Sequence, residues 1–253
     1  MSKGRLIDVS KCTACRGCQV ACKGWNELPA EHTTQVGTYE NPPELSGNTW
    51  IKVEFREQPG EWLFRAHTCM HCAEASCEKV CPTGAISHNG EIVIIDQDWC
   101  IGCGYCVQAC PFHVPHKDEE GQGTAQKCKM CIDRVTNGLA PACATTCPTG
   151  AIQFGERDEL IAMGNQRVNV LKNKGYADAN LYGETEMGGL HTMYVLTHPP
   201  ADFGLPEDPV LATNSTWAQW VSGVVAAGVV AAIPFWLLFK RKQRIESNVK
   251  GGT

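Results

Sequence analysis

The chain has 253 residues, a formal net charge of −5 and 16 cysteines. This length allows one large domain or two small ones with an appendage, and so many cysteines are typical of metal or redox proteins. The acidic balance, with no basic patch among aromatic residues, argues against a nucleic-acid partner. A disulfide framework predicts scattered cysteines behind a signal peptide. These cysteines instead form four groups of four, so disulfides are not expected.

Group one lies near the N-terminus and holds Cys12, Cys15, Cys18 and Cys22. Three cysteines recur at every third residue and the fourth follows four residues later, which is the spacing of bacterial ferredoxins that bind 4Fe–4S clusters. The next segment, 24–66, contains a loop rich in proline and glycine. It then reads TWIKVEF at 49–55, whose alternation predicts a strand, and residues 62–64 are candidates for its hairpin partner.

Groups two and three follow each other closely. They hold Cys69, Cys72, Cys77 and Cys81, and then Cys100, Cys103, Cys106 and Cys110. Group three, within WCIGCGYCVQACP, has the same tight spacing as group one. Its glycines, Gly102 and Gly104, are expected to let the backbone approach inorganic sulfides and donate amide hydrogens to them. A zinc ribbon has two well-separated Cys-x-x-Cys pairs, which this run does not resemble.

Group four follows a polar stretch at 115–127, which we expect to be a surface loop with Asp118-Glu119-Glu120 at a solvated tip. The group holds Cys128, Cys131, Cys143 and Cys147. Groups one and three share the tight spacing, and the string CPTGAI occurs at 81–86 and again at 147–152. This internal repeat predicts an α+β chain with two bacterial-ferredoxin-like units, each binding two 4Fe–4S clusters, four in all.

The pairing of the groups stays open from spacing alone. The fourth cysteine of a tight run normally ligates the other cluster of its unit. If groups two and three form a unit inserted into one made by groups one and four, four crossed ligand sets follow. They are set A (Cys12, Cys15, Cys18, Cys147), set B (Cys22, Cys128, Cys131, Cys143), set C (Cys69, Cys72, Cys77, Cys110) and set D (Cys81, Cys100, Cys103, Cys106). Pairing one with two and three with four is the alternative, and all sixteen cysteines are expected ligands either way.

The segment after group four predicts a helix over 156–174, ending near Gly175, and a strand over 191–196, HTMYVL. Prolines then mark an extended linker. The expected boundaries are 1–23 with 111–155 for the outer unit, 24–66 for a strand-containing insert, 67–110 for the inner unit, 156–214 for helix, strand and linker, 215–240 for a transmembrane helix and 241–253 for a basic cytoplasmic tail.

The transmembrane prediction rests on 221–239, nineteen uncharged residues that span ~28 Å as a helix, close to the ~30 Å hydrocarbon core. Trp217, Trp220 and Trp236 are expected interfacial anchors, and small residues within the helix favour contact with a membrane partner. A buried core helix is the alternative. The basic run at 240–244 places the C-terminus in the cytoplasm and the cluster units on the periplasmic side of the cytoplasmic membrane, in a single pass.

Export of the cluster units raises a question, because we expect no signal peptide before group one. A folded-protein exporter reading a twin-arginine signal on a bound partner would answer it. The remaining residues suggest little chemistry. His71 and the other histidines are expected to be structural, although His71 could tune a cluster. Lys23, Lys127 and Lys129 flank cysteines, and either offset cluster charge or are solvated.

CTACRGCQVACKGWNELPAE, CIGCGYCVQACPF and PACATTCPTGAIQFG closely resemble the iron–sulfur (beta) subunit of respiratory membrane-bound formate dehydrogenases, among the four-cluster subunits of molybdopterin and tungstopterin oxidoreductases. The resemblance implies a catalytic partner holding a molybdenum or tungsten bis-pterin cofactor, and a membrane cytochrome b whose haem passes electrons to quinone. It also implies the pairing of group one with four and of two with three.

We therefore expect a non-catalytic electron-transfer subunit, with no catalytic residues, between formate oxidation on the partner and the membrane; reverse flow is also open. One rival is the same subunit in a sulfur-compound or other oxyanion reductase, or in a hydrogenase. An independent cluster enzyme would need a group with three ligands, and no group is short of a cysteine. A structural zinc protein is the last alternative.

Overall fold

The computed structural model describes residues 2–117, 123–214 and 216–250. The chain divides into two compact units, Met1–Ala212 and Thr213–Thr253. The expected loop tip Asp118-Glu119-Glu120 and the last three residues of the expected basic tail lie outside the described residues. The first unit contains all sixteen cysteines and mixes helices with strands.

A four-stranded sheet organises the first unit. Its order is β8 (Ile152–Glu156), β1 (Lys3–Asp8), β10 (Thr192–Leu196) and β9 (Asn180–Tyr182). Strands β1 and β10 are parallel, with Arg5 opposite Thr192, and the two outer pairs are antiparallel. Every residue of β10 is buried, as expected for an inner strand of a covered sheet.

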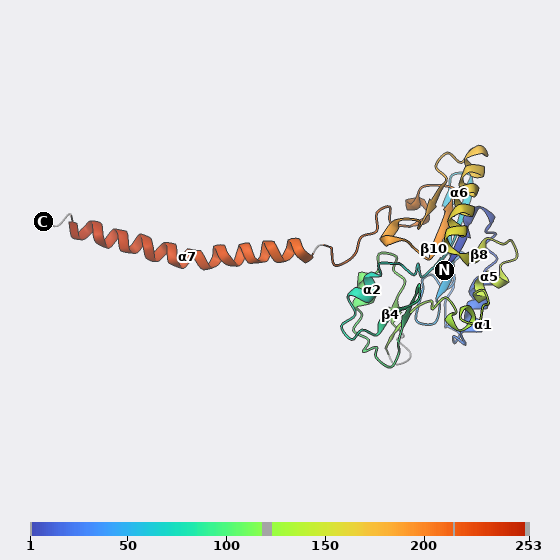
Figure 1. The fold of residues 1–253 in the computed structure, drawn as a ribbon, viewed down its shortest axis with the longest axis horizontal. Helices are drawn as coiled ribbons and strands as arrows, with labels where there is room; N and C mark the ends of the chain where they lie inside the picture. The colour runs from blue at the N-terminus through green and yellow to red at the C-terminus, as the bar shows by residue number, and fades with distance from the viewer. Residues whose placement is uncertain (1, 118–122, 215, 251–253) are drawn as a thin grey trace. The chain divides into compact units, whose positions relative to one another are not determined.

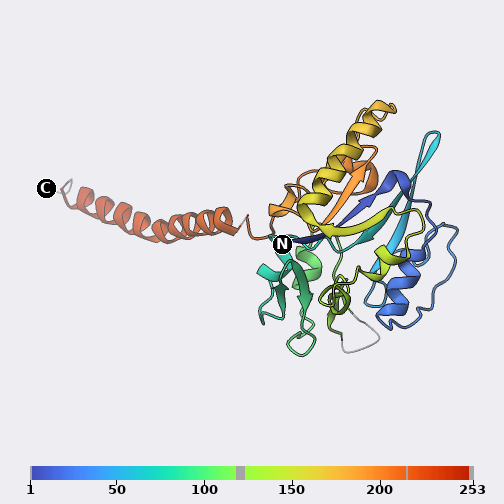
Figure 2. The ribbon, with the colours of Figure 1, turned by 45° about the vertical axis from the view of Figure 1, so that its right-hand side comes forward.

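Helix α6 (Arg157–Asn173) lies along one face of this sheet, as both ribbon views show (Figures 1 and 2). Its buried residues Leu160, Val168 and Leu171 pack on Leu6 and Val195 of the sheet. Spacings of three and four residues bring apolar side chains to one side of a helix, which explains this packing. The chain leaves the helix at Gly175, whose φ of 101° is a conformation that glycine adopts without strain.

The sheet's other face carries the segments around groups one and four. Helices α1 (Gly17–Trp25) and α5 (Ala142–Thr146) lie side by side there (Figure 1). The long hairpin of β2 (Ile51–Gln58) and β3 (Glu61–Thr68) joins the same core. Its members include Ile7, Tyr194 and Leu196 from the sheet, with Cys18, Cys22, Cys69, Cys128 and Cys143.

Most cysteines of groups two and three belong to a smaller lobe with its own apolar core around Ile86, Val93 and Ala125, while Cys69 and Cys110 pack on the main core. It is built from short elements. They are α2 (Ser76–Lys79), β4 (Ile86–Asn89), β5 (Ile92–Ile95), α3 (Tyr105–Ala109), β6 (His116–Lys117) and β7 (Ala125–Gln126). The remaining short helices are α4 (Ile132–Val135), η1 (Val9–Lys11), η2 (Glu186–Gly188) and η3 (Pro200–Phe203).

Several predicted elements are confirmed. The strand expected at 49–55 is β2, the candidate partner at 62–64 lies within β3, the helix expected at 156–174 is α6 and the strand expected at 191–196 is β10. The surface loop expected at 115–127 is wrong in part. Its ends pair as β6 and β7, and Ala125 and Lys127 are buried, because this hairpin covers the lobe core.

The second unit is described by itself. It consists of α7 (Thr216–Lys250), with Pro234 inside the helix. Its segment Trp220–Lys242 is the one helical stretch in the described residues that is long and apolar enough to cross a membrane, by length and composition. Along this stretch the apolar side chains of Val224, Val230 and Leu237 are more than half exposed.

Candidate cluster-binding site

A shared backbone turn follows the first cysteine of every group. The residue two positions later has a left-handed φ: Ala14 (53°), His71 (46°), Gly102 (65°) and Met130 (50°). Such turns make neighbouring amides converge on one point, which suits an anion. The amide of Met130 donates to Cys128 Sγ over 3.3 Å. Sequence reasoning recognised this turn only in group three, because the other three positions are not glycine.

Gly102 shows why one group needs glycine. A Cβ at this position would lie 2.5 Å from the carbonyl oxygen of Gly123, a contact that side chains do not tolerate. Gly104, two residues on, has a φ of 81° and opens α3. Its counterpart in group one is Arg16, with a φ of 61° at the start of α1. The tight spacing is therefore repeated in backbone conformation as well as in sequence.

The thiols of set A face one another across groups one and four. Burial, followed by the charges of Cys143, Cys12, Cys147 and Cys15 in that order, raises the pKa of Cys18 to about 12. Burial likewise raises the pKa of Cys12, with Cys147 and Cys15 as its neighbours. Cys147, which is distant in sequence, thus lies beside the first three cysteines of group one.

Set B is buried throughout. Its four cysteines line one cavity together with Arg5, Trp50 and Thr68. Burial raises the pKa of Cys22, and the nearby charges of the other three members of the set raise it further. Cys22 follows Cys18 by one helical turn of α1, so the two side chains share a helix face and reach neighbouring sets.

Sets C and D lie in the smaller lobe. Burial raises the pKa of Cys72, and Cys69, Cys110 and Cys77 then raise it in that order. In set D, burial and then the neighbouring thiols Cys100, Cys103 and Cys81 raise the pKa of Cys106, which is about 11 on balance. Both crossed cysteines, Cys110 and Cys81, therefore lie beside the other group's triplet.

The two CPTGAI turns are also alike in structure. Thr83 and Thr149 place their hydroxyls 3.6 Å and 3.7 Å from Cys81 Sγ and Cys147 Sγ. Burial by itself raises each thiol pKa, but these hydroxyls and the amides that follow lower both on balance. Strands β4 and β8 begin at the isoleucine of each turn. The sequence repeat thus stabilises a thiolate before each strand.

The sets follow one another in a row. Cys18 of set A interacts with Cys143 of set B, and Cys77 of set C interacts with Cys106 of set D. Arg5 joins the middle pair, because it donates to Cys143 Sγ over 3.3 Å and to the carbonyl oxygen of Cys69 over 3.2 Å. The exposed cysteines, Cys15 and Cys103, belong to sets A and D at the two ends.

The residues present fit 4Fe–4S clusters. Thiolates are the ligands that iron–sulfur clusters take. Two buried donors, Arg5 Nε and His71 Nε2, have no hydrogen-bond partner among the described residues, and inorganic sulfide would be an acceptor for such groups. Within the described chain, no group of three or more Cys, His, Asp or Glu side chains is arranged to hold a single metal ion. The thiolate ligands and these unpaired buried donors therefore fit clusters that contain inorganic sulfide.

The three lysines beside cysteines differ in position. Lys23 donates to the carbonyl oxygens of Pro29 (2.7 Å) and Asn48 (3.0 Å), so it secures the insert. Lys129 lines the set B cavity. Lys127 is 4% exposed, which excludes the solvated alternative for this residue. His71 is fully buried, its Nδ1 accepts from the amide of Val93 over 3.2 Å, and its Nε2 has no partner among the described residues.

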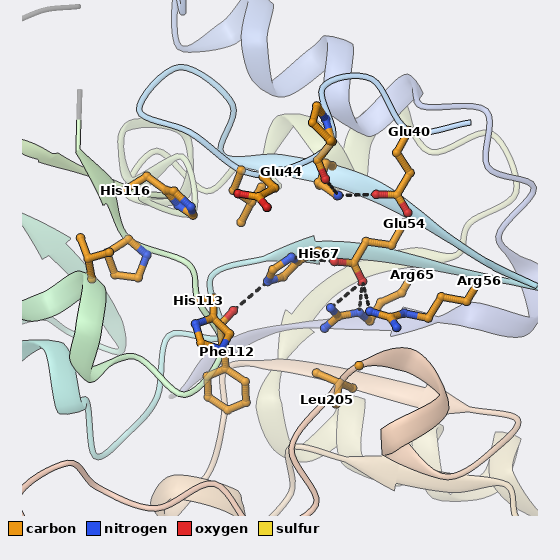
Figure 3. Close-up of a pocket in the computed structure, with 16 residues that line it drawn as sticks. Glu40, Glu44, Glu54, Arg56, Arg65, His67, Phe112, His113, His116 and Leu205 are labelled. Atoms are coloured by element: carbon orange, nitrogen blue, oxygen red, sulfur yellow. Dashed lines mark hydrogen bonds and ion pairs between the residues drawn. The ribbon is translucent and has the colours of Figure 1, made fainter. Parts of the chain in front are cut away.

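A polar cavity of about 590 Å³ lies between the β2–β3 hairpin and the loop after Cys110 (Figure 3). At its centre, Glu54 accepts from Arg65 over 2.6 Å and 3.0 Å, and its other oxygen lies 3.0 Å from His67 Nδ1. His67 Nε2 contacts the carbonyl oxygen of Phe112 over 2.9 Å. These contacts tie the hairpin to the segment that follows Cys110.

Replacing Glu54 by glutamine is expected to lower the free energy of unfolding by about 3 kcal/mol, or about 6–12 °C in Tm, because Arg65 is 3% exposed and loses its counter-charge. Although burial alone raises it, hydrogen bonding to His67 and the Arg65 charge hold the pKa of Glu54 well below its usual range. Ionised Glu54 therefore contributes its full stabilisation to the folded protein above about pH 4.3, and this stabilisation is lost as the pH falls below that value. Thermal unfolding of the purified protein at neutral pH measures the shift. Exposed Glu57 on the same strand is the control, and equal Tm values for Glu54→Gln and Glu57→Gln would contradict the prediction.

Comparison with known families finds two matches. A 4Fe-4S dicluster domain model matches residues 60–157, and a second 4Fe-4S dicluster domain model matches residues 11–85. The two matches overlap over 60–85 and together include all four cysteine groups. The chain therefore contains 4Fe-4S dicluster sequence from group one to group four.

Similar proteins cover most of the chain. The formate dehydrogenase, nitrate-inducible, iron-sulfur subunit of Escherichia coli (strain K12) is 44% identical over 237 residues, 90% of this chain and 80% of that protein. The formate dehydrogenase iron-sulfur subunit of Haemophilus influenzae is 43% identical over 236 residues, 89% and 75% of the two chains. The formate dehydrogenase subunit beta of Megalodesulfovibrio gigas is 38% identical over 214 residues, 79% of this chain and 96% of that protein.

Proposed function

Since this chain belongs to the iron–sulfur subunits of formate dehydrogenases, we propose that it carries electrons through four 4Fe–4S clusters, between a catalytic subunit that oxidises formate and an acceptor in the membrane. The order of the thiol sets carries this proposal. Sets A, B, C and D adjoin one another in turn, and the exposed cysteines lie in the two end sets. Electrons can therefore enter at one end and leave at the other.

The proposed ligands are the sixteen cysteines in the crossed sets A to D. The thiol neighbours of Cys12, Cys22, Cys72 and Cys106 support this assignment, because each lies beside members of its own set from a different group. When bound, a 4Fe–4S cluster takes up and returns one electron. The protein's part is to hold the thiolates, to donate amide hydrogens toward them and to exclude water from set B, whose four cysteines are all buried.

The proposed partners lie at the two ends of this row. One is a catalytic subunit with a molybdenum or tungsten bis-pterin cofactor, and the other is a membrane cytochrome b that passes electrons to quinone. Apolar side chains are exposed near both end sets, Val20 and Trp25 on α1 and Trp99, Ile101 and Tyr105 around group three. Exposed apolar side chains beside a redox centre are suited to a protein interface.

The membrane proposal concerns α7. We propose that Trp220–Lys242 crosses the cytoplasmic membrane once, with the cluster units on the periplasmic side and the C-terminus in the cytoplasm. Its length and composition support the crossing, and the basic residues at 240–244 support the orientation, since cytoplasmic flanks carry more lysine and arginine.

Low-temperature EPR of native membranes tests the proposed function. Anaerobic addition of formate is expected to produce reduced 4Fe–4S signals, with dithionite giving the maximum. These signals should be absent from membranes of a strain lacking this chain. Clusters that dithionite reduces and formate does not would exclude formate as the electron donor and leave the cluster assignment in place.

A further inference from the structure

Two buried cations lie between sets B and C. Arg5, on β1, is 0% exposed and Lys127, after β7, is 4% exposed. Among the described residues, neither forms a salt bridge with a carboxylate. A buried charge without a counter-charge is unfavourable, so the structure calls for a negative group near both.

Arg5 contacts both sets. Its Nη1 donates to Cys143 Sγ of set B over 3.3 Å, and its Nη2 donates over 3.2 Å to the carbonyl oxygen of Cys69 of set C. Thr192, its partner across the parallel strands, accepts from Nη2 over 2.9 Å and donates to the same Cys69 oxygen. The guanidinium is thus held in one orientation, with its Nε still unpaired.

Lys127 lies on the other side of the same junction. Its Nζ donates to the carbonyl oxygens of Val93 and Cys128. Its charge acts on Cys77 and Cys110 of set C and on Cys128 of set B. Lys127 therefore serves both inner sets, as Arg5 does.

Because these contacts place both cations against ligand residues of the inner sets, the junction favours added negative charge on sets B and C.

We propose that Arg5 and Lys127 are fixed buried charges that raise the reduction potentials of the clusters held by sets B and C. This inference rests on the proposed function. Reduction adds one negative charge to a cluster, and a nearby cation in a medium of low dielectric constant stabilises that state. The end sets A and D lack a buried cation of this kind among their described contacts, so the two inner clusters are the more easily reduced.

Four variants separate charge from structure. Arg5→Gln and Lys127→Gln remove one charge each, and Arg5→Lys keeps the charge while losing the planar fork. Lys3→Gln is the matched control, because Lys3 lies on the same strand and its partly exposed side chain bridges to Glu156 over 2.6 Å. Iron content of each purified protein shows whether its clusters assemble.

EPR-monitored redox titration of the anaerobically purified complex measures the midpoint potentials. In Arg5→Gln and Lys127→Gln, the reduced-to-oxidised ratio of the inner clusters at a fixed potential is expected to fall at least tenfold, about 59 mV for a one-electron couple. The inner-cluster midpoint potentials of Arg5→Lys should stay close to the wild-type values, and those of Lys3→Gln should not change. If Arg5→Gln loses its clusters, the midpoint potentials of Lys127→Gln and Arg5→Lys test whether the buried charges raise the potentials of the inner clusters.

Two failures are distinguishable. Wild-type protein without reducible clusters would overturn the proposed function itself. Wild-type clusters together with unshifted midpoints in fully loaded Arg5→Gln or Lys127→Gln would overturn this inference alone. An equal shift in Lys3→Gln would do so as well, because it would show that any lost positive charge has the same effect.

Discussion

Replacing Cys22 by serine is expected to abolish the same cluster as replacing Cys128, and to leave intact the cluster that depends on Cys12. The reason is the crossing of ligands between groups one and four. Cys22 belongs to group one in sequence, but its thiol lies beside Cys128, Cys143 and Cys131. Each single variant should lose about a quarter of the iron.

The measurement is iron content and EPR of the reduced, anaerobically purified protein. Cys22→Ser and Cys128→Ser should lack one and the same signal, and Cys12→Ser and Cys147→Ser should both lack a different one. Val20→Ser is the control on α1, because Val20 is 71% exposed and should keep all signals. Loss of one common signal in Cys22→Ser and Cys12→Ser would instead support uncrossed ligation.

Local repeats were the part of this molecule that sequence could predict. The second CPTGAI string predicted a second copy of one turn, and both copies place a threonine hydroxyl beside a cysteine before a strand. Helix α6 and strand β10 are predictable because the periodic spacing of apolar residues can be read from a short stretch of sequence. The dicluster family follows from the cysteine spacing for the same reason.

Long-range pairing was not predicted. Strand β1 lies between β8 and β10, which are about 150 and 190 residues distant. No local pattern in KGRLID specifies these partners, because strand pairing depends on tertiary context. The sequence alone therefore does not indicate the burial of Arg5, since only the sheet carries this residue into the interior beside Cys143.

Two other features could not be predicted from the sequence, and each has a physical reason. Left-handed turns are expected at glycine, yet Ala14, His71 and Met130 adopt them, and such strained conformations persist where the surrounding structure enforces them. Lys127 resembles any surface lysine in sequence. Its burial follows from the β6–β7 hairpin. Each strand of this hairpin is two residues long, which is too short to show the alternation of apolar and polar residues that predicts a strand.

Ending the chain at Ala212 is expected to release it from membranes almost completely while its clusters remain. Ala212 is the last residue of the first unit, and all sixteen cysteines precede it. The removed helix exposes apolar side chains such as Val224, Val229 and Val230 along its length. Apolar surface of this extent is stable in a bilayer and not in water, so the full chain should resist alkaline carbonate extraction.

The experiment compares membrane and soluble fractions from cells that produce this chain without the proposed cytochrome, so that no partner retains it. Val230→Arg should weaken insertion by about 2.5–3.5 kcal/mol, because it places a charge near the middle of the apolar segment. Val230→Leu keeps the apolar character at the same depth and should stay in the membrane. Extraction of the full chain to the same extent as the shortened one would show that α7 does not cross the bilayer. Retained EPR signals in the shortened chain would separate the loss of anchoring from any loss of the cluster unit.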